Sequence, residues 1–171
     1  MMNLGEDKGK IVLEAIHKYK PKTILELGTF VGYSSLVMAH ASKATVHTFD
    51  PNEACTSTAR KFHDHAGLSG LIKIHLGTIQ AHEEFIKQHG PFDMIFIDHW
   101  KNLYLSDLKW LEEHGAIQKG TVVIGDNIIT PGSPDYLAYF KESKNYNSTL
   151  FHSNLEYCDI PDAVLVSERI N

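Results

Sequence analysis

The chain contains the segment Phe96-Ile97-Asp98-His99-Trp100-Lys101, in which a short apolar run ends abruptly in polar side chains. The segment Ile124-Gly125-Asp126-Asn127 has the same form further along the chain. Short apolar runs of this kind predict buried strands. Because an unpaired buried carboxylate is costly, Asp98, Asp126 and Asn127 at the strand ends indicate a compensating partner. Their oxygen atoms favour a hard cation, Mg²⁺ or Ca²⁺.

Helix capping is the alternative explanation for these residues, because Asp and Asn often cap helices at strand-to-helix turns. Taken singly, Asp98 or Asp126 fits a cap better than a metal ligand. Lys101 lies three residues after Asp98, close enough to serve the same site. As a set, the residues favour a metal beside a lysine, which suggests activation of a hydroxyl nucleophile.

Length and composition fit one globular domain. The chain has 171 residues, of which 43% are hydrophobic, and a formal net charge of −5. The acidic balance and the absence of a Lys/Arg cluster argue against a nucleic-acid partner. No apolar run approaches the roughly 18 residues that span a bilayer, and the polar first ten residues do not form a secretory signal. We therefore predict one domain over residues 1–171, with neither a nucleic-acid nor a membrane partner.

The cysteines and histidines indicate no further site. Cys55 and Cys158 are the only cysteines and lack metal-type spacing, so a reducing cytoplasm is the expected location. His63 and His65 flank Asp64, but residues two apart on a helix point to different faces. A solvated helix face is therefore the favoured interpretation of this pair, and a zinc site the alternative.

Strand and helix signals alternate along the chain. Strands are predicted over residues 23–27, 45–49, 72–76, 92–97, 121–124, 149–156 and 163–167. Helices are predicted over residues 33–41, 53–66, 80–88, 103–114 and 134–142. This rhythm predicts a mostly parallel sheet with helices on both faces. The last two strands have no clear helix between them and predict an antiparallel edge hairpin.

Polar residues and glycines gather at the predicted strand ends. They are Glu26, Gly28, Asp50, Gly77, Asp98, Asp126 and Asn127. Parallel sheets bind ligands outside the carboxyl ends of their strands, near the point where the strand order reverses. The coincidence across five strands therefore predicts one binding site at this edge.

The turn after the first strand, Glu26 to Ser34, indicates the ligand. Its glycines, Gly28 and Gly32, follow a G-x-x-x-G spacing and not the G-x-G-x-x-G dinucleotide fingerprint. Glu26 would repel a phosphate and attract an ammonium or sulfonium cation. Asp50 ends the second strand, where adenosine-binding folds place the acceptor for the ribose hydroxyls. These features favour S-adenosylmethionine over the alternative, a glycine-rich helix cap with solvated acids.

With these motifs the chain resembles the catechol O-methyltransferases, a family of class I S-adenosylmethionine-dependent methyltransferases. The resemblance runs from about Asn3 to the last strand. It is carried by residues 26–28 (ELG), 32–34 (GYS), 98–101 (DHWK), 120–122 (GTV), 126–127 (DN), 131–135 (PGSPD) and 155–157 (LEY). The first motif is common to many methyltransferases, whereas DHWK, DN, PGSPD and LEY in this order are specific. The implied fold is Rossmann-like, with a mostly parallel seven-stranded sheet, an antiparallel edge hairpin and helices on both faces.

The resemblance also implies site residues and a reaction. Asp98, Asp126 and Asn127 would hold Mg²⁺, Lys101 would be the general base, and Glu156 would bind the catechol hydroxyl that is not methylated. The implied substrate-binding residues are Trp100, Lys101, Asn127, Pro131, Glu156 and Cys158. The implied cofactor-binding residues are Leu4, Glu26, Gly28, Tyr33, Ser34, Asp50, Pro51, Thr78, Gln80, Asp98, His99 and Trp100. The expected reaction moves the methyl group of S-adenosylmethionine to one hydroxyl of a catechol.

Three departures from the family pattern affect the expected pocket. The extra helices that family members carry before the segment at Asn3 do not occur in this sequence, so either they have been removed or the substrate pocket is more open. Pro51 alters the face that packs on adenine, and Cys158 widens the substrate side. Two alternatives stay open: a related enzyme acting on a caffeoyl thioester, and a non-catalytic module that binds S-adenosylmethionine. We expect a small-molecule partner and a monomer or weak homodimer.

Overall fold

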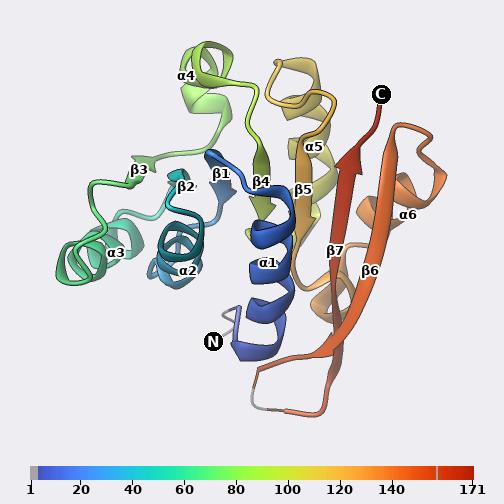
Figure 1. The fold of residues 1–171 in the computed structure, drawn as a ribbon, viewed down its shortest axis with the longest axis horizontal. Coiled ribbons are helices and arrows are strands. Elements are labelled where there is room, and N and C mark those ends of the chain that lie inside the picture. Colours follow the sequence, from blue (N-terminus) through green and yellow to red (C-terminus); the bar gives the residue numbers. More distant parts are fainter. Residues whose placement is uncertain (1–3, 157) are drawn as a thin grey trace.

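The computed structural model describes residues 4–156 and 158–171. Asn3 and Tyr157, which belong to the segments of the family resemblance, lie outside these ranges. The centre of the molecule is a seven-stranded sheet in the order β3-β2-β1-β4-β5-β7-β6 (Figure 1). Strands β1 to β5 are parallel, and β7 runs antiparallel to both β5 and β6. The predicted mostly parallel sheet with an antiparallel edge hairpin is confirmed.

The helices and strands alternate as the sequence predicts. The strands are β1 (Thr23–Leu27), β2 (Thr45–Asp50), β3 (Ile72–Leu76), β4 (Met94–Ile97), β5 (Val122–Gly125), β6 (Tyr146–Asn154) and β7 (Pro161–Arg169). The α-helices are α1 (Glu6–Tyr19), α2 (Tyr33–Ser42), α3 (Glu53–His65), α4 (Glu83–His89), α5 (Tyr104–Glu113) and α6 (Pro134–Glu142). Three short helical turns are η1 (Gln80–His82), η2 (Lys101–Leu103) and η3 (Ile128–Gly132).

Helix α1 and the length of the last hairpin differ from the sequence analysis, which assigned no element before residue 23. In α1 the apolar residues Val12, Ala15 and Ile16 follow helical spacing and are buried against the sheet. In the hairpin, β6 and β7 pair from Tyr146 with Arg169 to Asn154 with Pro161. Cross-strand hydrogen bonds therefore extend both strands into polar sequence, where no apolar alternation marks them.

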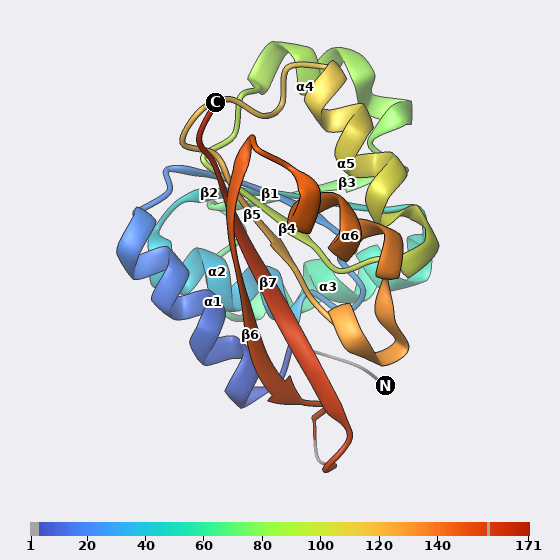
Figure 2. The ribbon, with the colours of Figure 1, turned by 90° about the vertical axis from the view of Figure 1, so that its right-hand side faces the viewer.

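The sheet separates two apolar clusters. Ile95 and Ile97 of β4 pack in a cluster that includes residues of α4, α5 and α6. Met94 and Phe96 of the same strand pack in the other cluster, with residues of α1 and α2. Alternate residues of a strand point to opposite faces, so a strand covered on both faces is apolar throughout. Figure 2 shows α1, α2 and α3 on one face and α4, α5 and α6 on the other.

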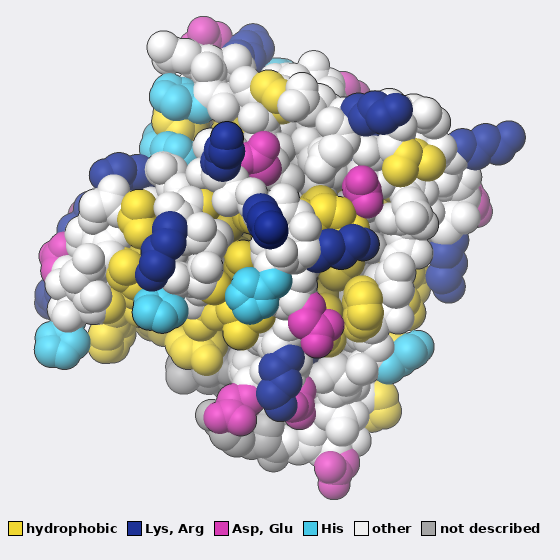
Figure 3. Space-filling view, in the orientation of Figure 1, with side chains coloured by type: hydrophobic (Ala, Val, Ile, Leu, Met, Phe, Trp, Pro, Cys, Tyr) yellow, Lys and Arg dark blue, Asp and Glu magenta, His cyan; other side chains and the backbone are white. Residues whose placement is uncertain are grey.

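The surface shows no single-sign face in the view of Figure 3, where basic, acidic and histidine side chains are interspersed. None of the helices within residues 4–156 and 158–171 combines the length and apolar character that crossing a bilayer requires.

Two phenylalanines on helices provide a test of this layered core. Phe140 of α6 is 2% exposed, whereas Phe62 of α3 is 51% exposed. We expect Phe140→Ala to lower the free energy of unfolding by about 3–5 kcal/mol, because it leaves a cavity. Phe62→Ala, the control, should cost less than about 1 kcal/mol. Urea unfolding measures both, and equal losses would contradict the assignment of Phe140 to the core.

Candidate active site

A cavity of about 790 Å³ lies at the carboxyl ends of the parallel strands. Its lining includes Gly28 after β1, Asp50 at the end of β2, Gly77 after β3 and Asp98 after β4. The strand order reverses between β1 and β4, so this is the place where such sheets bind ligands. The cavity thus lies at the edge of the sheet where the sequence analysis predicted a binding site.

The cavity brings together most of the residues that sequence analysis assigned to a ligand. All predicted cofactor-binding residues except Glu26 line it. Of the predicted substrate-binding residues, Trp100, Lys101, Asn127 and Pro131 line it, and Glu156 and Cys158 do not. Lining residues to which the sequence analysis assigned no ligand are Leu27, Thr29, Phe30, Phe49, Asn52, Cys55, Gly77, Ile79, Leu103 and Asp107.

Gly28 allows the loop after β1 to approach the end of β4. Its φ is +102°, and a Cβ built on it would lie 2.6 Å from the backbone oxygen of Asp98. A side chain would therefore separate the two strand ends that border the cavity. The turn therefore requires glycine at position 28.

Gly32 allows a second close approach, to a histidine that the sequence analysis placed on a solvated helix face. That interpretation is wrong for His63, which is 1% exposed. Its Nε2 lies 3.0 Å from the Ser35 hydroxyl and 3.3 Å from the Gly32 carbonyl oxygen. A Cβ on Gly32 would collide with the same nitrogen. Burial lowers the pKa of His63, in keeping with a neutral ring beneath the turn.

Glu26 is fully buried beside the start of α2. The Ser34 hydroxyl donates a hydrogen bond to its Oε1, at 2.5 Å. Its Oε2 has no hydrogen-bond partner among the described residues. Burial raises the pKa of Glu26 from 4.5 to about 8. A buried carboxyl group with an unused oxygen fits a ligand that carries positive charge nearby.

Asp50 presents a fixed carboxylate at the end of β2. Its Oδ2 accepts a hydrogen bond from the backbone N–H of Phe30 at 2.9 Å, and its Oδ1 accepts one from the backbone N–H of Asn52 at 2.8 Å. Each carboxylate oxygen has a further lone pair, so Asp50 can still accept from hydroxyl groups in the cavity. This geometry fits the predicted ribose contact.

Asp107 of α5 holds the side chains of Gln80 and His99, two residues that were predicted to bind the cofactor. The sequence analysis missed Asp107. The Gln80 side-chain amide donates to Asp107 Oδ1 at 2.8 Å, and His99 Nε2 lies 2.7 Å from Asp107 Oδ2. Because Asp107 accepts the amide N–H, the carbonyl oxygen of Gln80 is left for a ligand. The buried Nδ1 of His99 has no partner among the described residues. In sequence Asp107 resembles any acid in a first helical turn, so no signal marked it.

The second half of the site contains two carboxylates at the ends of β4 and β5. Lys101 Nζ donates to Asp98 Oδ1 at 3.0 Å and to the Tyr104 hydroxyl at 2.5 Å. Burial raises the pKa of Asp98 against the lowering effect of Lys101. Burial and the neighbouring charge of Asp98 raise the pKa of Asp126 to about 7. The positive charge of Lys101 therefore does not balance the negative charges of Asp98 and Asp126.

The donor set fits a hard divalent cation. Asp98 and Asp126 supply carboxylates, and the side chain of Asn127 supplies an amide oxygen, which are ligands that Mg²⁺ accepts. Within residues 4–156 and 158–171 no three His, Cys, Asp or Glu side chains form a metal-binding group. Asp98, Asp126 and Asn127 do not form such a group, because the side chain of Asn127 is an amide. The alternative zinc site around His63 and His65 gains no support from the geometry.

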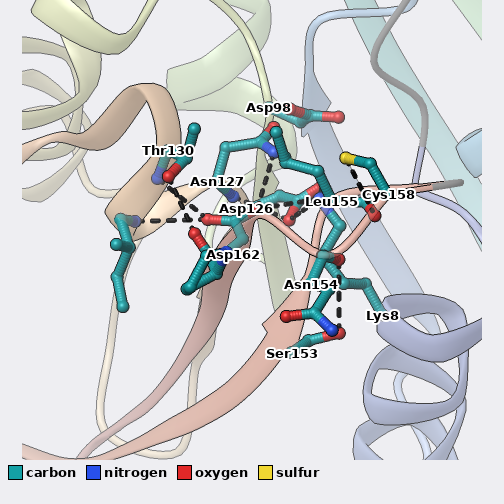
Figure 4. A network of polar contacts seen from close by, with 12 residues as sticks. Lys8, Asp98, Asp126, Asn127, Thr130, Ser153, Asn154, Leu155, Cys158 and Asp162 are labelled. Atoms are coloured by element: carbon teal, nitrogen blue, oxygen red, sulfur yellow. Dashed lines mark hydrogen bonds and ion pairs between the residues drawn. The ribbon is translucent and has the colours of Figure 1, made fainter.

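Two buried residues that the sequence analysis missed complete the polar network behind the carboxylates (Figure 4). Lys8 of α1 is 2% exposed, and its Nζ lies 2.8 Å from Asp126 Oδ1 and 3.1 Å from Asp162 Oδ2. Asp162 of β7 also accepts from the Asn127 amide at 2.8 Å. These partners are far apart in the sequence, so no local sequence pattern predicts their contacts.

Glu156 and Cys158 follow β6 and are not among the residues that line the cavity. A Cβ on Gly5 would collide with Glu156 Oε2, so the glycine before α1 provides the space that Glu156 occupies. Cys158 is exposed, and its Sγ lies 3.7 Å from the Leu155 carbonyl oxygen.

The raised pKa of Glu26 predicts how the free energy of unfolding depends on pH. Glu26 stays protonated in the folded state up to about pH 8, whereas in the unfolded chain it ionises above about 4.5. Its contribution to the free energy of unfolding therefore falls as pH rises from about 4.5 to 8. We expect Glu26→Gln to gain stability relative to the parent protein over this interval, by a few kcal/mol at most.

Urea unfolding between pH 5 and 8.5 measures this difference. Glu84→Gln is the matched control, because the Glu84 side chain is 94% exposed. If the curves for the parent protein and Glu26→Gln run parallel, Glu26 does not titrate as described.

Comparison with known proteins identifies the family. The model of the O-methyltransferase family matches residues 1–141. Catechol O-methyltransferase of Mus musculus is 38% identical over 168 residues, which cover 95% of this chain and 63% of that protein. Catechol O-methyltransferase of Sus scrofa is 36% identical, with 95% and 90% covered. The chain thus spans less than two thirds of the mouse relative's length.

Solved structures agree in fold. An O-methyltransferase from Bacillus cereus in complex with SAH has a TM-score of 0.85 and 22% identity, with 98% of this chain and 83% of that chain covered. An O-methyltransferase structure from Klebsiella pneumoniae, described as putative, has a TM-score of 0.86 and 20% identity, with 99% and 82% covered. Given the match over residues 1–141 and the identity to these relatives, the chain belongs to the O-methyltransferase family.

Proposed function

We propose that the protein transfers the methyl group of S-adenosylmethionine to one hydroxyl of a catechol, with the help of Mg²⁺. The observation that most supports this proposal is a single cavity lined by Asp50 and Gln80 at one part and by Lys101 and Asn127 at another. Direct transfer between two small molecules requires donor and acceptor to share one space. Relatives 35–38% identical to this chain are named catechol O-methyltransferase.

S-adenosylmethionine matches the groups on the β1 and β2 side of the cavity. Asp50 would accept hydrogen bonds from the ribose hydroxyls, as the resemblance implies. The positive charge of the methionine part would lower the pKa of Glu26 in the complex, and the ionised carboxylate, whose Oε2 has no hydrogen-bond partner among the described residues, would then offset that charge. Gln80, held by Asp107, would present its amide oxygen to the edge of the adenine, and the ring of His99, held by the same carboxylate, would contact the adenine.

Asp98, Asp126 and Asn127 would hold Mg²⁺. The cation would supply positive charge that favours the deprotonated form of a nearby hydroxyl. The raised pKa of Asp126 supports this assignment, because a carboxylate short of positive charge is stabilised by a cation.

Lys101 would act as the general base at Nζ. A neutral amine has two N–H donors and one lone pair, and Asp98 and Tyr104 can accept both donors. The lone pair would then accept the proton of the substrate hydroxyl. Burial raises the pKa of Tyr104 well above its ordinary value, so Tyr104 stays a phenol and donates to the backbone oxygen of Asp126 at 3.1 Å.

The oxygen freed of its proton would attack the sulfonium methyl carbon. The bond from carbon to sulfur breaks as the bond to oxygen forms, and the products are a methyl ether and S-adenosylhomocysteine. Trp100 and Pro131, which line the cavity, would hold the flat ring. Glu156 would bind the second hydroxyl and Cys158 would border the pocket, as the resemblance implies.

A caffeoyl thioester is the second candidate substrate class. Trp100 is 74% exposed, and Phe30 and Tyr33 are 41% and 42% exposed. A rim this open would accommodate an acyl group larger than a catechol. A Staphylococcus aureus structure described as a putative caffeoyl-CoA O-methyltransferase shares the fold, with a TM-score of 0.79 and 21% identity.

The proposal includes the remaining expectations about the whole protein. These are a single domain over residues 1–171, a cytoplasmic location, a monomer or weak homodimer, and a small-molecule partner in place of a nucleic acid or a membrane.

Calorimetry and turnover test the function together. We expect dinitrocatechol to bind only when both S-adenosylmethionine and Mg²⁺ are present, because all three share one cavity. Methyl transfer to a small catechol should exceed transfer to a caffeoyl thioester, and a strong chelator should abolish it until Mg²⁺ is restored. Faster transfer to the thioester would favour the second substrate class. Tight S-adenosylmethionine binding without turnover of either substrate would identify a non-catalytic module.

Lys101→Ala tests the base. We expect the rate of methyl transfer to fall by about 10²–10⁴-fold, because proton removal loses its acceptor. The affinity for S-adenosylmethionine should change little. Lys109→Ala on α5 is the matched control, because that lysine is exposed and lies outside the cavity. Near-normal turnover of Lys101→Ala would remove Lys101 from this role.

A further inference from the structure

We propose that Asp162 is a positioning residue that turns the Asn127 amide so that its oxygen faces the candidate metal site. This inference rests on the proposed function, since it concerns the Mg²⁺ site assigned there. Asp162 belongs to β7, outside the segments that carry the family motifs, and is 0% exposed. A buried carboxylate requires donors around it, and the donors of Asp162 reveal its role.

The Asn127 amide has one orientation compatible with this neighbour. Its Nδ2 lies 2.8 Å from Asp162 Oδ2. An ionised carboxylate accepts hydrogen bonds and donates none, so only the NH₂ end of the amide can face it. Asn127 is 1% exposed, so water would not screen the repulsion between its amide oxygen and Asp162 in the other orientation. The amide oxygen, which is the atom a hard cation would bind, therefore points away from Asp162.

Asp162 is itself held rigidly. Its Oδ1 accepts hydrogen bonds from the backbone N–H groups of Ile129 and Thr130, at 3.2 and 3.1 Å. Its Oδ2 accepts from Lys8 Nζ at 3.1 Å in addition to the Asn127 amide. Figure 4 shows Asp162 in contact with Asn127 and with the turn at Thr130. Four donors on two oxygens leave Asp162 no freedom to release the amide.

Lys8 links this positioning to the neighbouring ligand. Its ammonium contacts both Asp126 oxygens, at 2.8 and 3.0 Å, as well as Asp162. The Asn127 backbone N–H adds a bond to Asp126 Oδ1 at 2.7 Å. Lys8 thereby balances the charge of Asp162 and restrains the plane of the Asp126 carboxylate. Groups that hold ligands in this way typically contribute about 10- to 100-fold to metal affinity.

Binding of Mn²⁺ alone, followed by electron paramagnetic resonance of the free ion, tests the inference without turnover. Mn²⁺ accepts the same oxygen ligands as Mg²⁺. We expect Asp162→Asn to weaken Mn²⁺ binding by about 10- to 100-fold, because the new amide can donate to Asn127 and allow it to turn over. Asp159→Asn, at an exposed position just before β7, is the matched control and should bind as the parent protein does.

A double variant separates positioning from charge or misfolding. Asn127→Asp with Asp162→Asn exchanges donor and acceptor, retains the net charge and keeps the hydrogen bond between the two positions. A carboxylate at 127 presents an oxygen whichever way it turns, so we expect Mn²⁺ affinity within about threefold of the parent protein or tighter. Thermal melting shows whether each variant is folded, and the double variant carries the test if Asp162→Asn alone is not.

The outcomes distinguish this inference from the proposed function. Parent-like Mn²⁺ binding by folded Asp162→Asn overturns the inference alone. A double variant that binds at least tenfold more weakly than the parent protein overturns it as well. A parent protein that binds no Mn²⁺ overturns the metal assignment of the proposed function and this inference with it.

Discussion

Buried negative charge at the carboxyl ends of β4 and β5 is the constraint on which the rest of the site depends. Asp98 and Asp126 follow strands that are buried on both faces, and burial raises the pKa of each. Lys101 reaches Asp98 from the adjacent turn, and Lys8 reaches Asp126 from α1. These cations leave the pair short of positive charge, so the site favours a divalent metal, whose charge would in turn favour a deprotonated hydroxyl.

The same constraint ties the two ends of the chain to the centre of the sheet. Helix α1 contributes Lys8, while just before it Leu4 lines the cavity and Gly5 leaves room for Glu156. Strand β7 contributes Asp162, which accepts from Lys8 and Asn127. The antiparallel hairpin therefore does more than cover an edge of the sheet. It holds one of the proposed metal ligands.

The two halves of the cavity are joined by close backbone packing. Gly28 lets the loop after β1 approach the backbone of Asp98, so residues that would bind the cosubstrate and the acceptor share one wall. His99 and Lys101 follow Asp98 closely in the chain and serve opposite halves, the first through Asp107 and the second through Tyr104. A methyl donor and a hydroxyl acceptor would thus be positioned by one short segment after β4.

The sequence by itself determined the alternation of strands and helices, the parallel sheet with its hairpin, and the edge at which Asp50, Asp98 and Asn127 meet. These features follow from local periodicity and from the common direction of parallel strands. Only the tertiary structure decided the roles of Lys8, Asp107 and Asp162 and the buried position of His63. Their partners lie on other elements or turns of the chain. Whether such a side chain is solvated or buried in a hydrogen-bond network depends on what packs against it, and no local pattern records that.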